Sequence, residues 1–159
     1  MRTRWMLRKH LPEVVELDRD SYGDDHWDKD DFCTILNQRN CIGMVAEDDD
    51  HNVLGFVIYV LHPHHLMVMR FIGLYDEVAE VLVDMLKAKL SKERKSSVSL
   101  VMHERSTDSL LLMQSLGFYA VGCCGDLIKI TCRYDGSQAP WEPDMVLEDG
   151  WHTASAWPT

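Results

Sequence analysis

The clearest pattern of hydrophobic and polar positions lies in residues 66–90, LMVMRFIGLYDEVAEVLVDMLKAKL. Residues 66–74 are almost continuously apolar apart from Arg70, which is typical of a buried strand. From Val78 onward, apolar residues recur at helical spacing and form a stripe broad enough for a helix that packs on a sheet. We therefore expect a strand over 66–74 and a helix over about 76–91, with Leu82 and Leu86 buried.

The remaining elements follow from shorter signals. Apolar runs predict strands over 3–7, 41–47, 53–61, 97–103, 120–124 and 126–134. Helices are predicted over 10–22, 28–37 and 106–116, because Pro12 suits a first helical turn, Asp28 is a good N-cap and Gly117 suits a left-handed helix end. The resulting order, β, α, α, β, β, β, α, β, α, β, β, predicts an α/β (α+β) fold with a mixed sheet covered by helices.

Length and composition favour one domain with a tail. A chain of 159 residues with 46% hydrophobic content can bury one sizeable core, and we assign it to residues 1–134. The tail, 135–159, differs in composition because it carries Trp141, Trp151 and Trp157 among prolines and acids. Disordered tails are usually poor in aromatic residues. The tail could therefore dock on its own domain, on the partner subunit of a homodimer or in an acceptor groove; a flexible terminus is the alternative.

Charge and hydropathy exclude several classes of partner. The net charge of -10 argues against a nucleic-acid-binding protein, because phosphate contacts need a clustered basic surface. No stretch approaches the roughly 20 apolar residues of a membrane span, and no apolar run of signal-peptide length follows the basic N-terminus. We expect a cytoplasmic protein without membrane or nucleic-acid partners.

The cysteines and clustered histidines give no metal signal. Five cysteines without CxxC spacing fit reduced thiols better than disulfides or a zinc site. For Cys123 and Cys124, a nucleophilic role is possible, but buried structural thiols are more common. The histidines at 62, 64 and 65 have no carboxylate or cysteine at ligand spacing, so we expect a solvated turn there and no metal.

Four segments together resemble a known family. They are RWMLRKHLPEVVELDRDSY, HWDKDDF, NCIGMVAEDDDHNVLGFVIYVLH and LVMHERSTDSLLLMQSLGF. In this order they resemble the GNAT superfamily of N-acetyltransferases, closest to the ribosomal-protein-alanine N-acetyltransferase type, over residues 4–134. The resemblance implies a mixed, mostly antiparallel sheet splayed between its fourth and fifth strands. It also implies acetyl-CoA in the splay, with the pyrophosphate on the N-terminus of the next helix.

The sequence departs from the family where the pyrophosphate would bind. Family members have an Arg/Gln-x-x-Gly-x-Gly/Ala loop there, whose backbone N–H groups hold the phosphates. The corresponding segment is shorter in this chain and retains one glycine; its cofactor-site positions are Phe71, Ile72, Gly73, Asp76 and Glu77. Because two carboxylates would face two phosphates, we expect acetyl-CoA to bind very weakly or not at all.

The proton-transfer positions of the family are also replaced. The resemblance places the general-base glutamate at Val101 and the tyrosine that protonates the thiolate at Met113, and neither side chain transfers protons. Replacement candidates are Glu104, or its neighbour His103, as base and Tyr75 as acid. Both candidates have a simpler structural interpretation. Glu104 and His103 could be helix-capping or solvated groups. Tyr75 could simply pack at a strand–helix junction.

Two classes of function remain open. One is a catalytically impaired GNAT-like protein that acts as a protein- or peptide-binding module, which the shortened loop favours. The other is an active N-acetyltransferase that moves acetyl from acetyl-CoA to a protein or small-molecule amine with a relocated base, which the family resemblance favours.

Overall fold

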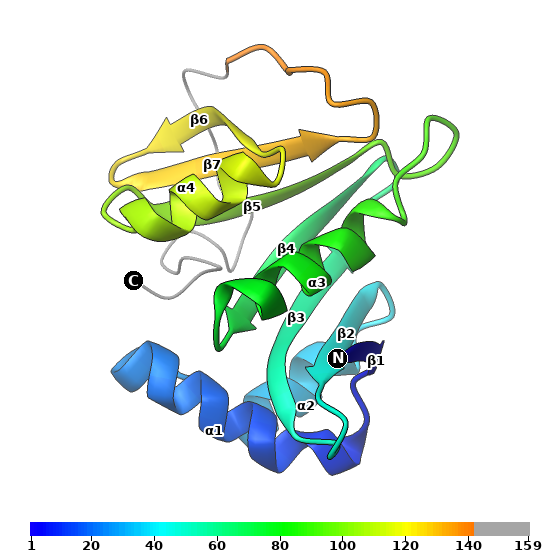
Figure 1. The fold of residues 1–159 in the computed structure, drawn as a ribbon, viewed down its shortest axis with the longest axis vertical. Helices are drawn as coiled ribbons and strands as arrows, with labels where there is room; N and C mark the ends of the chain where they lie inside the picture. Colours follow the sequence, from blue (N-terminus) through cyan, green and yellow to red (C-terminus); the bar gives the residue numbers. More distant parts are fainter. Residues whose placement is uncertain (142–159) are drawn as a thin grey trace.

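The structure, a computed structural model, describes residues 1–141. Trp151 and Trp157, on which the predicted docking of the tail partly depends, lie outside the described residues. Seven strands form one sheet with helices on both faces (Figure 1). The strands are β1 (Arg2–Trp5), β2 (Cys41–Glu47), β3 (Val53–Leu61), β4 (His65–Gly73), β5 (Ser97–His103), β6 (Tyr119–Cys124) and β7 (Leu127–Arg133). The α-helices are α1 (Leu11–Tyr22), α2 (Lys29–Leu36), α3 (Asp76–Lys87) and α4 (Thr107–Ser115), with short 3-10 helices η1 (Arg8–His10) and η2 (Gly23–Asp25).

The sheet is mixed and mostly antiparallel, as predicted. Its strand order is β1-β2-β3-β4-β5-β7-β6, and β4 and β5 form its parallel pair. That pair is joined over three residue pairs, from His65–Ser97 to Met67–Ser99, after which the strands diverge (Figure 1). The predicted splay between the fourth and fifth strands is therefore present.

A β-bulge in β4 accounts for part of this divergence. Ile58 of β3 pairs with Arg70 and Tyr59 pairs with Val68, so Met69 is an extra residue in β4. A bulge bends its strand and increases the local twist. Because Met69 lies two residues beyond the last β4–β5 pair, the bend falls where the two strands begin to separate.

Two apolar layers hold the helices to the sheet. Helices α3 and α4 cover one face, where Leu82, Leu86 and Met113 belong to the larger core cluster. Helices α1 and α2 cover the other face, where Val14 and Phe32 belong to a second cluster. The predicted burial of Leu82 and Leu86 is confirmed, at 0% and 1% exposure.

Helix α3 lies close to the sheet because Gly55 of β3 has no side chain. A Cβ on Gly55 would stand 2.4 Å from the Ile72 carbonyl oxygen and 2.7 Å from Val78 Cγ1. Because that atom is absent, the first turn of α3 can lie close to β3 and β4.

The structure corrects the predicted limits of two elements. Strand β1 ends at Trp5 rather than at residue 7, because the chain turns into η1 from Leu7. Helix α3 ends at Lys87, not near residue 91, since the chain must return to start β5; Leu90 instead forms a bridge with Lys95. The end of α4 is as expected, with Gly117 at φ +101°.

The prediction that Cys123 and Cys124 are buried is wrong. Both are exposed at the end of β6, the outer strand of the sheet. They pair with β7 immediately before the hairpin turn at Gly125, and β6 has a neighbouring strand on one side alone within the described sheet. Cys41 and Cys132 are buried, as expected of structural thiols.

Candidate functional site

The connection between β4 and α3 is the centre of the candidate site, because the family resemblance places the cofactor phosphates there. It consists of Leu74 and Tyr75, two residues between the end of β4 and the start of α3. The Leu74 N–H donates to the Leu54 carbonyl oxygen at 3.0 Å, which fixes the connection to β3. Tyr75 is the N-cap of α3 in an extended conformation, and its side chain makes no capping hydrogen bond. A connection this short leaves few backbone N–H groups for an anion.

The five expected cofactor positions carry no cationic or hydroxyl side chain that could bind a phosphate. Phe71 and Ile72 are buried, at 0% and 3% exposure, so their side chains belong to the core. Gly73 packs against α3, where an added Cβ would lie 3.0 Å from the Ala79 nitrogen. Asp76 and Glu77 are exposed in the first turn of α3. Acidic groups there stabilise the helix through its dipole and repel a second anion.

The two family positions for proton transfer lie inside the fold. Val101 is 1% exposed on β5, and Met113 of α4 is fully buried in the larger core cluster. The structure thus agrees with the sequence that neither position carries an acid or a base. It adds that Met113 packs among Leu82 and other core residues, so this side of α4 serves packing.

The proposed replacement residues lie on opposite sides of the splay. Tyr75 follows β4 and is 51% exposed, while Glu104 follows β5 with an exposed side chain. The Glu104 N–H donates to the Asp126 carbonyl oxygen at 2.8 Å. Helix α4 begins at Thr107, with Ser106 as N-cap, so Glu104 has the solvated rather than the capping role.

His103 has a partner that the sequence did not indicate. Its Nδ1 lies 3.3 Å from Asp126 Oδ2, a carboxylate in the turn between β6 and β7. The contact lacks hydrogen-bond geometry, so the carboxylate stands beside the imidazole without fixing its tautomer. His103 lies on the same face of β5 as Val101, by strand alternation. The pairing of β5 with β7 brings His103 next to Asp126, and no spacing along the sequence indicates this contact.

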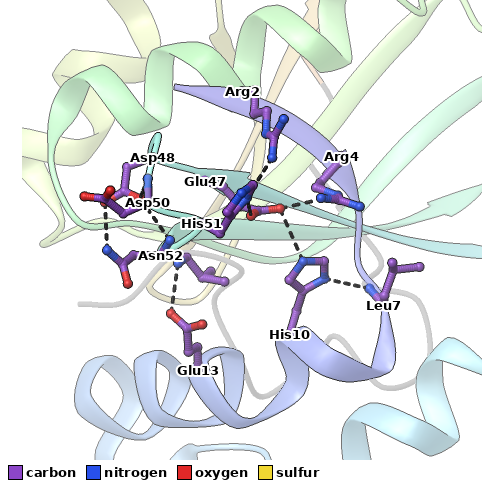
Figure 2. Close-up of polar contacts among 11 residues, drawn as sticks. Arg2, Arg4, Leu7, His10, Glu13, Glu47, Asp48, Asp50, His51 and Asn52 are labelled. Carbon is purple, nitrogen blue, oxygen red and sulfur yellow. Dashed lines mark hydrogen bonds and ion pairs between the residues drawn. The ribbon is translucent and has the colours of Figure 1, made fainter.

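A buried carboxylate, Glu47, joins three further elements (Figure 2). Its Oε1 lies 3.4 Å from Arg4 Nε and 3.3 Å from His10 Nε2, and its Oε2 lies 3.4 Å from His51 Nδ1. The Leu7 N–H donates to His10 Nδ1 at 2.8 Å, so the neutral ring carries its proton on Nε2, which faces Glu47. Burial lowers the pKa of His10 below 6.5, although Glu47 acts in the opposite direction.

A second buried ion pair lies beneath α1. Arg70 donates from Nε and Nη2 to the two carboxylate oxygens of Asp18, at 2.9 and 3.1 Å. Its guanidinium lies between the rings of Tyr22 and Trp27, 3.4 and 4.3 Å from their centroids. The sequence analysis missed this pair; a lone arginine in an apolar strand was the available signal, because buried charges require partners.

Neither a metal site nor a membrane-spanning helix is present in residues 1–141. Within this range no group of three or more His, Cys, Asp or Glu side chains could hold a metal ion. No helix in the same range is long and apolar enough to cross a membrane.

Comparison with known proteins identifies the fold. The sequence matches no protein-family model and no curated protein. Similar solved structures include an aminoglycoside 6'-N-acetyltransferase from Enterococcus faecium, with a TM-score of 0.70 and 14% identity over 91% of this chain and 100% of that one. Spermidine N-acetyltransferase from Vibrio cholerae, solved with CoA and spermine, gives 0.67 and 14% over 85% and 96%. A GNAT-family acetyltransferase from Staphylococcus aureus Mu50 gives 0.66 and 12% over 84% and 98%.

These similarities concern the arrangement of the elements, since the identities are between 12% and 14%. The ribosomal-protein-alanine type suggested by the sequence stays a prediction. The alignments span 84% to 91% of this chain, so they take in most of its sheet and helices. The chain therefore has the fold of the GNAT N-acetyltransferases.

Proposed function

We propose that this chain is a GNAT-fold protein that binds a protein or peptide and does not transfer acetyl groups. The observation that carries the proposal is the two-residue connection from β4 to α3, followed by Asp76 and Glu77. A protein that does not bind acetyl-CoA has no use for a catalytic acid or base. The buried, apolar Val101 and Met113 at those two family positions are consistent with a protein that does not transfer acetyl groups.

The expected loss of affinity for acetyl-CoA is large. A hydrogen bond to a charged group contributes about 1.5 to 3 kcal/mol, so the loss of three pyrophosphate contacts would remove roughly 4 to 9 kcal/mol. A micromolar complex corresponds to only about 8 kcal/mol of binding free energy. Repulsion from Asp76 and Glu77 adds to this loss.

The splay supports a binding role without chemistry. The β4–β5 ladder ends at Met67 and Ser99, and beyond it the two strands diverge. Leu74 and Tyr75, 53% and 51% exposed, lie at the open end. An extended peptide can pair with a strand edge through its backbone and place apolar side chains on such residues.

Isothermal titration calorimetry with acetyl-CoA tests the proposal. We expect no saturable binding by the unmodified protein. A matched variant, D76N/E77Q, removes the repulsion but restores no N–H donors, so it too should fail to bind. One-to-one binding with a low-micromolar Kd by the unmodified protein would overturn the proposal.

The binding role needs its own measurement. A library of extended peptides screened against the folded protein should yield ligands whose affinity falls in a Leu74→Ser/Tyr75→Ser variant. Leu111→Ser provides the control, because Leu111 is similarly exposed, at 58%, but lies on α4 and not on the β4–α3 connection. Peptide ligands that bind both variants equally would exclude the splay as their site.

One observation favours an active N-acetyltransferase as the second candidate. The contact between His103 and Asp126 places a carboxylate 3.3 Å from an imidazole nitrogen at the end of β5, at the open side of the splay. In that case His103, or the neighbouring Glu104, would accept the proton of the acceptor amine and Tyr75 would act as acid. Acetylation of an amine substrate that stops in His103→Gln would support this candidate.

A further inference from the structure

A cavity of about 330 Å³ lies on the β5–β7–β6 side of the sheet. Ser99 of β5 and Thr131 of β7 lie side by side in its floor, because they pair directly in the strand register. The adjacent Ile130 belongs to the larger core cluster with Met113 of α4. Successive strand residues point to opposite faces, so the cavity opens on the face of the sheet opposite α4.

The charges around this cavity are cationic. Lys129 and Arg133 of β7 line it, and His64 and His65 contribute imidazoles from the other side. No aspartate or glutamate is among the described residues that line it. The whole chain carries a net charge of -10, so a cavity lined by two permanent cations is a local exception that favours an anionic ligand.

The hydroxyl groups in the floor supply a directed donor. Ser99 Oγ and Thr131 Oγ1 are 2.7 Å apart and share one hydrogen bond. Each hydroxyl has one proton, so the pair uses one and retains the other for a ligand. Both residues are buried, at 4% and 6% exposure, where a hydrogen bond to a charged group is stronger than in water.

The walls are held in place by hydrogen bonds within the chain. Ser96 donates from its backbone nitrogen and its Oγ to the His64 carbonyl oxygen, at 2.9 and 3.1 Å. On the far side, the Ala139 N–H donates to Tyr119 Oη at 2.6 Å. A site built before the ligand arrives loses less entropy on binding.

Arg133 remains available to a ligand despite its neighbours. Its Nη1 donates to Ser137 Oγ at 3.4 Å, which leaves four of the five guanidinium N–H groups. The Asp135 carboxylate accepts hydrogen bonds from Ser137 N and Oγ, at 2.9 and 2.6 Å. Its hydrogen bonds are therefore made within its own turn, although its charge also interacts with the Arg133 guanidinium.

We propose that this cavity binds a small organic dianion, of the dicarboxylate class, through Lys129, Arg133 and the Ser99–Thr131 hydroxyl pair. The two cations, Lys129 and Arg133, lie four residues apart on one strand, which separates their Cα atoms by roughly 13 Å. Each cation can therefore bind a different acidic group of one ligand. The volume is at the lower end of ligand pockets, which suits a small molecule. This site is independent of whether acetyl-CoA binds in the splay.

Calorimetric titration of the full chain with glutarate tests the site, with butyrate as the singly charged control ligand. We expect saturable one-to-one binding of glutarate and affinity for butyrate at least about tenfold weaker, because one charge-assisted hydrogen bond is lost. In K129Q and in R133Q, glutarate affinity should fall at least about tenfold, toward that of butyrate.

Lys89→Gln is the matched control, since Lys89 is an exposed lysine after α3 and lies outside the cavity. It should bind glutarate like the unmodified protein. Far-UV circular dichroism and thermal unfolding of each variant establish that it is folded. Absence of saturable glutarate binding, equal affinities for glutarate and butyrate, or unchanged affinity in folded K129Q and R133Q would each overturn the proposal.

Discussion

At the scale of single residues, the Arg70–Asp18 pair is a buried ion pair whose two hydrogen bonds join α1 to β4. Both groups are almost fully buried, at 1% and 0% side-chain exposure. Each charge is compensated, because Trp27 N–H also donates to Asp18 Oδ2 at 2.6 Å and Arg70 Nη2 donates to the Asp25 carbonyl oxygen at 2.8 Å. The pair ties α1 and the following segment to β4.

Arg70→Met should therefore destabilise the protein by about 3 to 5 kcal/mol, because Asp18 would remain buried without its partner. Urea unfolding monitored by circular dichroism gives this value. The double variant R70M/D18L should recover part of the loss, since it leaves no buried unpaired charge. A single variant within about 1 kcal/mol of the unmodified protein would contradict the interpretation.

His10 should make stability depend on pH. Its pKa is below 6.5 in the folded state, mainly because of burial, so the unfolded chain binds a proton at a higher pH than the folded chain. Stability should thus fall as the pH drops below 6.5, by up to about 1.4 kcal/mol per pH unit from this group. The hydrogen bond from Leu7 N–H to His10 Nδ1 explains why the folded state disfavours the protonated ring: a proton on Nδ1 would break this hydrogen bond.

Comparison of His10→Gln with the unmodified protein checks this expectation. Unfolding free energies measured at several pH values between about 7.5 and 5.5 should decrease less steeply for the variant. His64→Gln serves as the control, since His64 is exposed and is not among the residues whose side chains contact Glu47, which are Arg4, His10 and His51. Identical slopes for His10→Gln and the unmodified protein would show that His10 does not carry the effect.

At the scale of elements, the approach of α3 to the sheet depends on Gly55. Gly55→Ala should destabilise by about 1 to 3 kcal/mol, because the new Cβ would overlap backbone and core atoms. Denaturant unfolding measures the change. Thr34→Ala is a control, since Thr34 is exposed on α2 and this substitution removes no core contact. Gly55→Ala with no loss of stability would mean that α3 can move away from β3 without cost.

At the scale of the whole molecule, acetyl transfer should not return when the two family residues are restored. The variant V101E/M113Y replaces side chains that are 1% and 0% exposed, so an unpaired carboxylate would be buried on β5 and stability should fall by a few kcal/mol. If acetyl-CoA lacks its phosphate contacts, as proposed, these two substitutions would not supply them. We expect no turnover with acetyl-CoA, measured as released thiol, and a lower Tm; turnover by this variant would show that the cofactor site is intact.

The local pattern of the sequence was sufficient for most of the fold. Residues 76–87 carry the broad apolar stripe of α3, and the continuous apolar run before them gives β4, because both signals depend on neighbouring residues alone. Gly117 marked the end of α4 for the same reason. The predicted end of α3 was wrong because that limit depends on where the chain must turn toward β5.

The short connection from β4 to α3 was also determined by the sequence, since it depends on the number of residues between Gly73 and Asp76. Tertiary structure alone decided which polar groups meet. His103 reaches Asp126, and Arg70 reaches Asp18, across 23 and 52 positions of the chain respectively. The physical reason is strand register and helix docking: they bring together side chains that no spacing along the sequence relates.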